Sequence, residues 1–187
     1  MIGFELPGGC RLRPLEESDA DELVRLVDAN CEHLRQWMTW VDATSNTREE
    51  RLAYIRRTRR QLAEDDGFQT AILDGDEIIG IVGFHGIDWR SRSTSIGYWL
   101  AADRQGKGTM TEAVRALTTH AFRGWGLHRV EIRVATGNER SAAIPLRLGF
   151  VEEGVLREAE RHGDHFKDLR VYSMLAADWE TQEARPG

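Results

Sequence analysis

The fold is decided by residues 97–112, which read GYWLAADRQGKGTMTE. An apolar strand segment runs into a glycine-rich basic turn, and a helix is expected straight after the turn. This arrangement presents unpaired backbone N–H groups to an anion. Gly106 and Gly108 allow a ligand to approach the backbone, and Lys107 adds positive charge. The stretch therefore predicts a phosphate-binding loop, and the alternative is an ordinary tight turn between strand and helix.

Two common nucleotide-binding patterns do not fit this loop. A P-loop needs a glycine, four further residues and then Gly-Lys-Ser/Thr, whereas Lys107 is followed by Gly108 and position 101 is Ala101. A dinucleotide fingerprint needs a third glycine where this chain has Thr111. The loop is therefore neither a P-loop nor a dinucleotide site.

A second motif lies downstream of the loop. Residues 127–135 alternate apolar and polar side chains, which predicts a strand. Residues 138–150 follow and read NERSAAIPLRLGF, a helical run that ends in Gly149 and Phe150. A strand, a polar N-cap and a short helix are therefore expected in succession downstream of the loop.

The two motifs together resemble the GNAT superfamily of acetyl-CoA-dependent N-acetyltransferases. The pyrophosphate loop of that superfamily (Gln/Arg-x-x-Gly-x-Gly/Ala) corresponds to Gln105–Met110, and its Asn-x-x-Ser/Ala helix ending in Gly-Phe corresponds to residues 138–150. The chain is most similar to the ribosomal-protein N-terminal acetyltransferases of the RimJ/RimL type, over about residues 11–176. That subgroup commonly has Met where Met110 stands. The other residues that carry the subgroup likeness are His33, Leu34, Trp37, Trp40, Tyr98, Trp99, Leu100, Thr111, Glu112, Gly126, Leu127, His128 and Arg129.

The resemblance implies an α/β fold with a mixed, mostly antiparallel sheet and helices on both faces. It also implies that two central strands splay apart in a V, between the strand ending at Leu100 and the strand 127–135. The residue pattern predicts the other elements independently. Strands are expected at 10–14, 68–73, 77–86, 93–100, 150–159 and 166–175, and helices at 19–30, 34–41, 47–64, 109–124 and 138–148, with Ser18 or Asp19 and Ser45 or Thr47 as N-caps.

Acetyl-CoA is the co-substrate that the resemblance implies, with no metal. The loop amides would bind its pyrophosphate, and the unpaired backbone of the strand before the loop would bind its pantetheine arm. Asn138 would bind the same arm, and its alternative role is a plain N-cap. The residues implied in cofactor binding are Tyr98, Trp99, Leu100, Gln105, Gly106, Lys107, Gly108, Thr109, Met110, Asn138 and Ser141.

Catalysis cannot use the tyrosine that many superfamily members have four residues after the Ser/Ala position, because Pro145 stands there. The RimL-type enzymes are thought to use a serine and a glutamate, which correspond to Ser141 and Glu160. Ser141 is the expected donor of a proton to the thiolate, or else only a helix-capping residue. Glu160 is the expected base, acting through water, or else a polar residue of a hairpin turn. Pro145 also deprives the Ser141 carbonyl of its helical partner.

Two tryptophans near the start of the chain are candidates for acceptor binding. Trp37 and Trp40 lie three residues apart on an expected short helix, where they form the floor of a peptide groove or pack in the core. His162 and His165 are expected to be surface turn residues, because two histidines without a third ligand nearby do not make a metal site.

Composition sets the remaining limits. The 187 residues are expected to form one domain, residues 1–187, with a polar tail from residue 181. The formal net charge of −6 argues against nucleic-acid binding, and no apolar run is long enough to span a membrane, so a cytoplasmic location is expected. Cys10 and Cys31 are expected as free thiols. A run of basic residues is expected to form a solvated helix face: Arg56, Arg57, Arg59 and Arg60.

The predicted function is direct transfer of an acetyl group from acetyl-CoA to a primary amine. An α-amine titrates near pH 8 and a lysine near 10.4, so an N-terminal amine needs less help from a base. The expected acceptor is the N-terminal amine of a protein, and the resemblance to the subgroup implies a ribosomal one. The alternatives are a small-molecule amine such as an antibiotic, polyamine or amino acid, a non-catalytic acyl-CoA-binding module, or a purely structural domain. A homodimer is consistent with the subgroup, and no residue pattern decides it.

Overall fold

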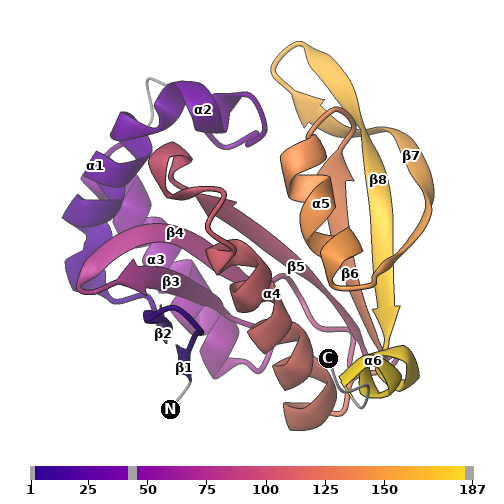
Figure 1. Ribbon diagram of the computed structural model, residues 1–187. Coiled ribbons are helices and arrows are strands. Elements are labelled where there is room, and N and C mark those ends of the chain that lie inside the picture. Colours follow the sequence, from indigo (N-terminus) through magenta and orange to yellow (C-terminus); the bar gives the residue numbers. More distant parts are fainter. Residues whose placement is uncertain (1–2, 42–45, 184–187) are drawn as a thin grey trace.

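One eight-stranded sheet runs through the molecule (Figure 1), in the strand order β1-β2-β3-β4-β5-β6-β8-β7. The computed structural model describes residues 3–41 and 46–183. All neighbouring strands pair antiparallel except β5 and β6, which pair parallel. The strands are β1 Phe4–Glu5, β2 Cys10–Pro14, β3 Gln69–Asp74, β4 Glu77–Phe84, β5 Ser93–Leu100, β6 Arg129–Ala135, β7 Val151–His162 and β8 His165–Leu175.

The two central strands separate along their length. The β5–β6 ladder consists of three pairs, from Ser93 with Arg129 to Ser95 with Glu131. Beyond Ser95, β5 stays paired with β4 as far as Leu100, and β6 stays paired with β8 as far as Ala135. The strands therefore diverge as a V, which confirms the predicted splay and is visible between β5 and β6 in Figure 1.

Helices cover both faces of this sheet. Helix α4 (Thr109–Thr119) and α5 (Glu139–Arg147) lie on one face, and α1 (Ala20–Ala29), α2 (Cys31–Arg35) and α3 (Arg48–Ala63) lie on the other. The alternation of strand side chains explains both layers. Ile72 packs in the core under α4, whereas its neighbours Ala71 and Leu73 pack against α1 and α3.

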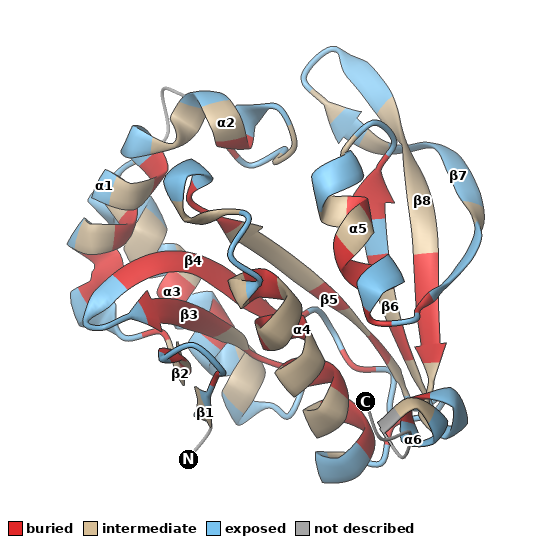
Figure 2. Ribbon diagram, viewed as in Figure 1, coloured by how far each residue is buried: buried red, intermediate tan, exposed pale blue. Residues whose placement is uncertain are grey.

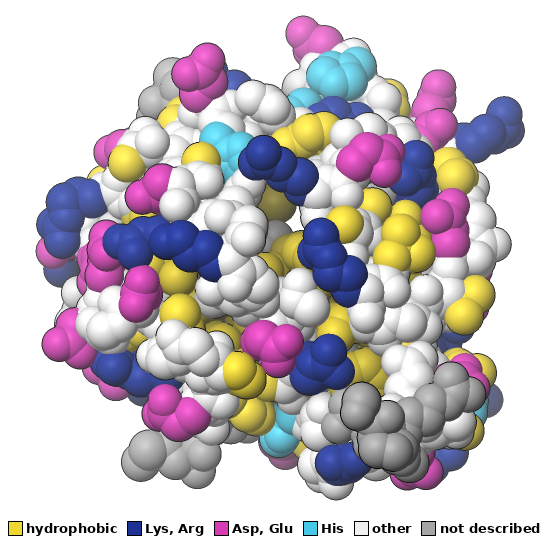
Figure 3. Space-filling view, viewed as in Figure 1, with side chains coloured by type: hydrophobic (Ala, Val, Ile, Leu, Met, Phe, Trp, Pro, Cys, Tyr) yellow, Lys and Arg dark blue, Asp and Glu magenta, His cyan; other side chains and the backbone are white. Residues whose placement is uncertain are grey.

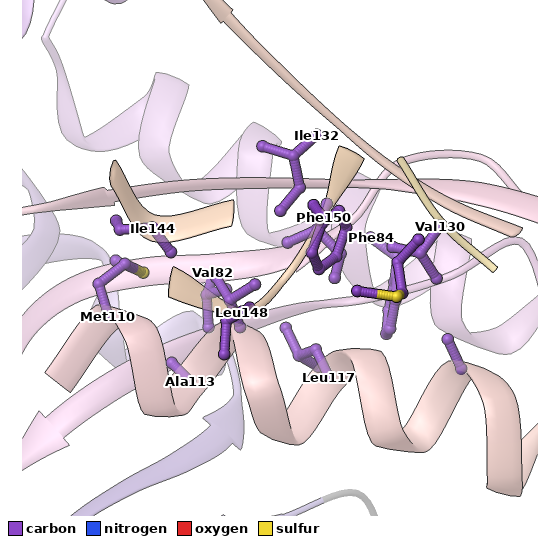
Figure 4. Packing of buried hydrophobic residues seen from close by; sticks show 14 of the residues in the cluster. Val82, Phe84, Met110, Ala113, Leu117, Val130, Ile132, Ile144, Leu148 and Phe150 are labelled. Carbon is purple, nitrogen blue, oxygen red and sulfur yellow. The ribbon is translucent and has the colours of Figure 1, made fainter. Parts of the chain in front are cut away.

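The apolar stripe of α4 produces the larger core. Met110, Ala113 and Leu117 recur at helical spacing and point toward the sheet, where they meet Val82 and Phe84 (Figure 4). These side chains are among the buried residues that Figure 2 colours red along the sheet and the inner side of α4. Helix α4 ends in one wider turn, His120–Gly124, so the predicted helix 109–124 is confirmed with this irregular last turn.

Some predicted elements are wrong. The expected helix 34–41 ends as α2 at Arg35, because the following tryptophans pack on different partners: Trp37 against Lys167 and Trp40 against Trp99. Helix α6, Ala176–Glu183, was not expected and takes up the first residues of the predicted tail, whose residues 184–187 lie outside the described residues. No helix in residues 3–41 and 46–183 is long and apolar enough to cross a membrane.

One predicted helix cap is confirmed, one is wrong, and one lies outside the described residues. Thr47 caps α3, since its Oγ1 accepts from the Glu50 N–H while the Glu50 carboxylate accepts from the Thr47 N–H. The alternative cap Ser45 lies outside the described residues. Asp19 does not cap α1, because its carboxylate is taken by the Glu16 N–H and by Arg13. Both cysteines are free, as predicted.

Candidate active site

The predicted phosphate loop lies at the start of α4. A short 3₁₀ turn, Ala102–Arg104, separates it from β5, so the strand does not lead straight into the loop. Gly106 has φ of 80° and Gly108 has φ of 82°, and a Cβ placed on either would meet no atom within 4 Å. The positive φ explains why glycine stands at both positions. The open space beside both glycines leaves the loop backbone accessible to a ligand.

The first turn of α4 has no side-chain cap. Its N-cap is Gly108, which has no side chain to accept from the N–H groups of Met110 and Thr111. The Met110 side chain is buried in the core, while Lys107 is exposed at the loop. Uncapped amides at a helix start with a lysine beside them form a site suited to a phosphate. Figure 3 shows this face with a hollow near its centre, rimmed by several Lys or Arg side chains.

Gln105 is anchored on both sides by its side chain. Its amide nitrogen donates to His33 Nε2 at 2.8 Å, and its amide oxygen accepts from Arg140 Nη1 at 3.0 Å. His33 lies on α2, the helix after α1, and Arg140 lies on α5. Gln105 therefore connects the two sides of the V. Burial, and secondarily the charge of Arg140, lowers the pKa of His33 below its ordinary value, so that its ring stays neutral and accepts this bond.

The edge of β5 that faces the V is free of strand partners after Ser95, among the pairings of the described residues. The backbone from Ile96 to Leu100 runs along this edge toward the loop. Unpaired backbone groups of this kind require a ligand or water. The edge is therefore suited to an extended molecule with amide groups, such as the pantetheine arm.

A cavity of about 950 Å³ lies on the α1–α3 side of the sheet and reaches the V. The predicted catalytic residues Ser141 and Glu160 both line it, and so do both predicted acceptor-binding residues, Trp37 and Trp40. Asn138, Tyr98 and Trp99 line it as well, whereas the loop residues 105–110 do not. The predicted loop and the predicted catalytic residues therefore do not line the same cavity.

Ser141 is held by three contacts at the start of α5. Its N–H donates to Asn138 Oδ1 at 3.2 Å, so Asn138 is an N-cap. Its hydroxyl donates to the Tyr98 hydroxyl at 3.2 Å, and the Tyr98 hydroxyl donates to the Ser141 carbonyl at 3.1 Å. Pro145 has no N–H for that carbonyl, so Tyr98 takes the place of the missing helical donor. Burial raises the pKa of Tyr98, and the phenol stays protonated.

Glu160 lies inside strand β7, opposite Lys167, and not in the turn where the alternative interpretation placed it. The β7–β8 register shifts between Leu156 and Glu160, which is where the strand bends. The tip of the hairpin contacts the segment after α2, because His162 Nε2 donates to the Arg35 carbonyl at 2.7 Å and Lys167 donates to the Gln36 carbonyl. These contacts join β7 and β8 to the tryptophan segment beside the cavity.

The tryptophans lie on the cavity wall rather than on a helix. Trp37 is partly buried beneath Lys167, and the exposed Trp40 packs its ring 6.0 Å from that of Trp99. The four arginines predicted as a solvated face are all exposed, and one of them, Arg57, also lines the cavity.

Comparison with known proteins adds a decisive match. The acetyltransferase (GNAT) domain family matches residues 10–151, most of the chain. The chain belongs to the GNAT acetyltransferase family. Members of this GNAT family take their acetyl group from acetyl-CoA, and the chain is an acyltransferase enzyme of this class.

Individual relatives agree with the GNAT assignment over nearly the whole chain. YdaF of Bacillus subtilis (strain 168), provisionally named a ribosomal N-acetyltransferase, is 37% identical over 172 residues, 92% of this chain and 94% of its own length. The ribosomal-protein-serine acetyltransferase of Escherichia coli (strain K12) is 29% identical over 88% of this chain and 91% of its own. A solved structure of RimL, the ribosomal L7/L12 α-N-protein acetyltransferase, with coenzyme A has a TM-score of 0.87 at 26% identity, over 95% of this chain and 99% of that one. The predicted RimJ/RimL likeness is thereby confirmed.

Sequence reasoning missed three features of this GNAT site. It treated Tyr98 only through its backbone, although Pro145 had indicated that the Ser141 carbonyl needs another donor. It gave no role to the Gln105 side chain beyond the loop motif. It also left out Arg51 and Tyr54, which line the cavity from α3. Their three-residue spacing on one helix face was the available signal.

Proposed function

We propose that this chain transfers the acetyl group of acetyl-CoA to the N-terminal α-amine of a protein, with a ribosomal protein as the first candidate. The observation that carries the proposal is the V itself. The free edge of β5 connects the loop at Gly106 and Gly108 to the cavity that Ser141 and Glu160 line. The names of the relatives support the ribosomal-protein acceptor. A cytoplasmic location, with no membrane or nucleic-acid partner, fits such an acceptor.

The donor would bind along this V. The loop amides of residues 105–110 would hold the pyrophosphate, and the β5 backbone at Tyr98, Trp99 and Leu100 would bond the pantetheine arm. Asn138 would contribute from α5, although its Oδ1 already accepts from the Ser141 N–H. A cofactor held in this way presents its thioester to the cavity, where the amine enters.

The acceptor amine would enter the cavity as an ammonium, lose one proton to Glu160 through a water molecule, and attack the thioester carbonyl as the neutral amine. The C–S bond then breaks, and the sulfur receives a proton from the Ser141 hydroxyl. The nitrogen of the tetrahedral intermediate gives up its second proton, which replaces the one that Ser141 donated. No covalent enzyme intermediate is needed, and neither free cysteine, Cys10 or Cys31, lines the cavity.

The test is a thiol-release assay with acetyl-CoA and a panel of amines, followed by mass spectrometry of the products. The panel holds peptides with free N-termini, the same peptides with blocked N-termini and an internal lysine, and the small amines spermidine and free amino acids. We expect one added acetyl group, on the α-amine of the free peptides only. Acetylation of blocked peptides or of small amines alone would refute the proposed acceptor, and cofactor binding without turnover would favour a non-catalytic acyl-CoA-binding module.

A further inference from the structure

The wall of the cavity formed by α3 has no role in the proposed reaction. Arg51, Tyr54 and Arg57 follow one another at three-residue spacing on α3, and all three line the cavity. We infer that Arg51 and Arg57 bind a carboxylate of the acceptor, so that the enzyme prefers protein N-termini with acidic residues just after the reacting amine. This inference rests on the proposed function and names the class of N-terminus that the site takes.

Arg51 is held in place without an acidic partner. Its guanidinium lies 5.2 Å from the centre of the Trp40 ring, and its Nε is buried with no hydrogen-bond partner in the described structure. Burial lowers the pKa of Arg51 from its ordinary value, but an arginine stays ionised in a protein. A buried unpaired donor on a charged group costs free energy, which an incoming anion would recover.

Arg57 is placed in the same way, with its guanidinium 5.4 Å from the centre of the Tyr54 ring. The tyrosine is partly buried, and loss of water around its hydroxyl raises its pKa to about 12, so it stays a neutral platform. Aromatic faces orient both guanidinium groups, and no ion pair among the described residues occupies their N–H edges. Bidentate binding of a carboxylate uses those edges.

Two of the other arginines of α3 are paired with carboxylates. Arg48 contacts Asp21 at 3.0 Å, and Arg56 contacts Glu17 at 2.9 Å. In the part of the chain that the structure describes, no ion pair involves Arg51 or Arg57. The two arginines that line the cavity are thus available for a ligand, whereas those two outside it are neutralised.

The charges of the residues that line the cavity also favour an anionic ligand. Three arginines line it, the third being Arg133, against the two acids Glu50 and Glu160, in a chain whose formal net charge is −6. Arg133 pairs with Glu131 at 3.0 Å, and the Glu50 carboxylate is taken by the Thr47 N–H. His85, the remaining titratable group of the wall besides the tyrosines, is kept neutral because burial and then Arg133 lower its pKa. Among the described residues that line the cavity, the cations without an ion pair are therefore the two on α3.

The size of the cavity and the placement of its arginines both favour a peptide over a lone amine as the occupant. A cavity of about 950 Å³ is at the upper end of ligand sites in general. The arginines lie on α3, while Ser141 and Glu160 belong to α5 and β7, on other walls. A carboxylate bound at α3 would therefore belong to residues that follow the one being acetylated.

The experiment compares three peptides that differ only at positions 2 to 4, which are all glutamate, all glutamine or all lysine, after a common N-terminal serine. We expect kcat/KM for the acidic peptide to exceed that for the neutral one about tenfold, and the basic peptide to be the poorest. The preference should weaken at high salt, since screening shortens the range of charge interactions. In an Arg51→Gln/Arg57→Gln variant the three peptides should become equivalent, with the KM for acetyl-CoA unchanged.

Arg60→Gln is the matched control, because Arg60 is an exposed arginine of the same helix that does not line the cavity. It should keep the preference of the wild type. Equal rates for the three wild-type peptides, a preference that survives in the double variant, or an equal loss in Arg60→Gln would each overturn the inference. So would faster acetylation of free glutamate than of any peptide.

Failure of the proposed function is distinguished by a binding measurement. If no peptide is acetylated, calorimetry with the same three peptides and the wild-type protein still tests the cationic wall. Tighter binding of the acidic peptide, lost in the double variant, supports the inference without the activity. Equal affinities overturn it.

Discussion

The Tyr98 hydroxyl donates to the Ser141 carbonyl across the opening of the V, over a sequence separation of 43 residues. This bond exists because Pro145 cannot supply the helical N–H that the carbonyl would otherwise accept. The same hydroxyl accepts from Ser141 Oγ. One residue of β5 thus satisfies the backbone of α5 and orients the side chain proposed to protonate the leaving thiolate.

Replacing Tyr98 with phenylalanine should lower both stability and activity. The partly buried Ser141 carbonyl loses its donor, which costs about 1–3 kcal/mol of the free energy of unfolding. The Ser141 hydroxyl loses its acceptor, so kcat should fall while the KM for acetyl-CoA changes little. Urea unfolding and steady-state kinetics measure the two effects.

Pro145→Ala provides the matched background for this change. Alanine restores an N–H four residues after Ser141, so the carbonyl gains a helical donor. In a double-mutant cycle, Tyr98→Phe should then cost less unfolding free energy than in the wild type. Equal costs in both backgrounds would show that the hydroxyl–carbonyl bond is not what Tyr98 contributes to stability.

Replacing Gly108 with alanine should weaken cofactor binding beyond its effect on stability. At a φ of 82° an alanine costs about 1 kcal/mol, and its methyl group projects into the open space beside the loop. We expect the KM for acetyl-CoA to rise about tenfold, since close approach of the pyrophosphate to the amides is blocked. Gly75→Ala is the control, because Gly75 has φ of 62° with nothing within 4 Å and lies in the β3–β4 turn. It should lose similar stability and keep the KM.

A structural feature could be predicted from the sequence where neighbouring residues alone determine it. The alternation of Val130, Ile132 and Val134 predicts β6, and the glycines of the loop predict the positive φ angles of 80° and 82°. These features follow from neighbouring residues alone. The predicted V came from the family resemblance, since no local pattern states that the β5–β6 ladder ends after Ser95.

Features that depend on distant partners were missed. Helix α6 reads AADWETQE, a mostly polar run, and it forms because Trp179 is buried and its indole N–H donates to Thr119 Oγ1 on α4 at 3.3 Å. The predicted helix around Trp37 is too long, because the rings of Trp37 and Trp40 pack against different elements of the fold. The place of Arg57 on the cavity wall was missed for the same reason, since its helix position does not show that a cavity lies on that side.

Replacing Glu160 with glutamine should slow acetyl transfer about 10²–10⁴-fold, the usual contribution of a general base. The isosteric amide keeps the size of the side chain and cannot take a proton from the acceptor. Single-turnover rates with preloaded acetyl-CoA measure the chemical step directly. Glu158→Gln, an exposed carboxylate on the same strand that does not line the cavity, is the control and should retain the wild-type rate. Equal losses in both variants would assign the effect to the strand and not to Glu160 as base.

The bridge from His33 through Gln105 should make the protein sensitive to mild acid. Burial and Arg140 lower the pKa of His33, whereas the unfolded chain titrates near 6.5. Above pH 6.5 the ring is neutral in both states and stability does not change. As the pH falls from 6.5 toward the lowered pKa, the unfolded state binds the proton first, so the free energy of unfolding decreases. A protonated His33 also cannot accept from Gln105, so the KM for acetyl-CoA should rise as the pH falls through the lowered pKa of the folded state. His33→Gln, which keeps an acceptor and does not titrate, should show a smaller drop in stability between pH 7 and 5.5 and a KM for acetyl-CoA that depends less on pH.

His128→Gln, at an exposed histidine before β6, is the control and should reproduce the wild-type profile. If the two variants have the same pH profile, the acid sensitivity does not come from the bridge.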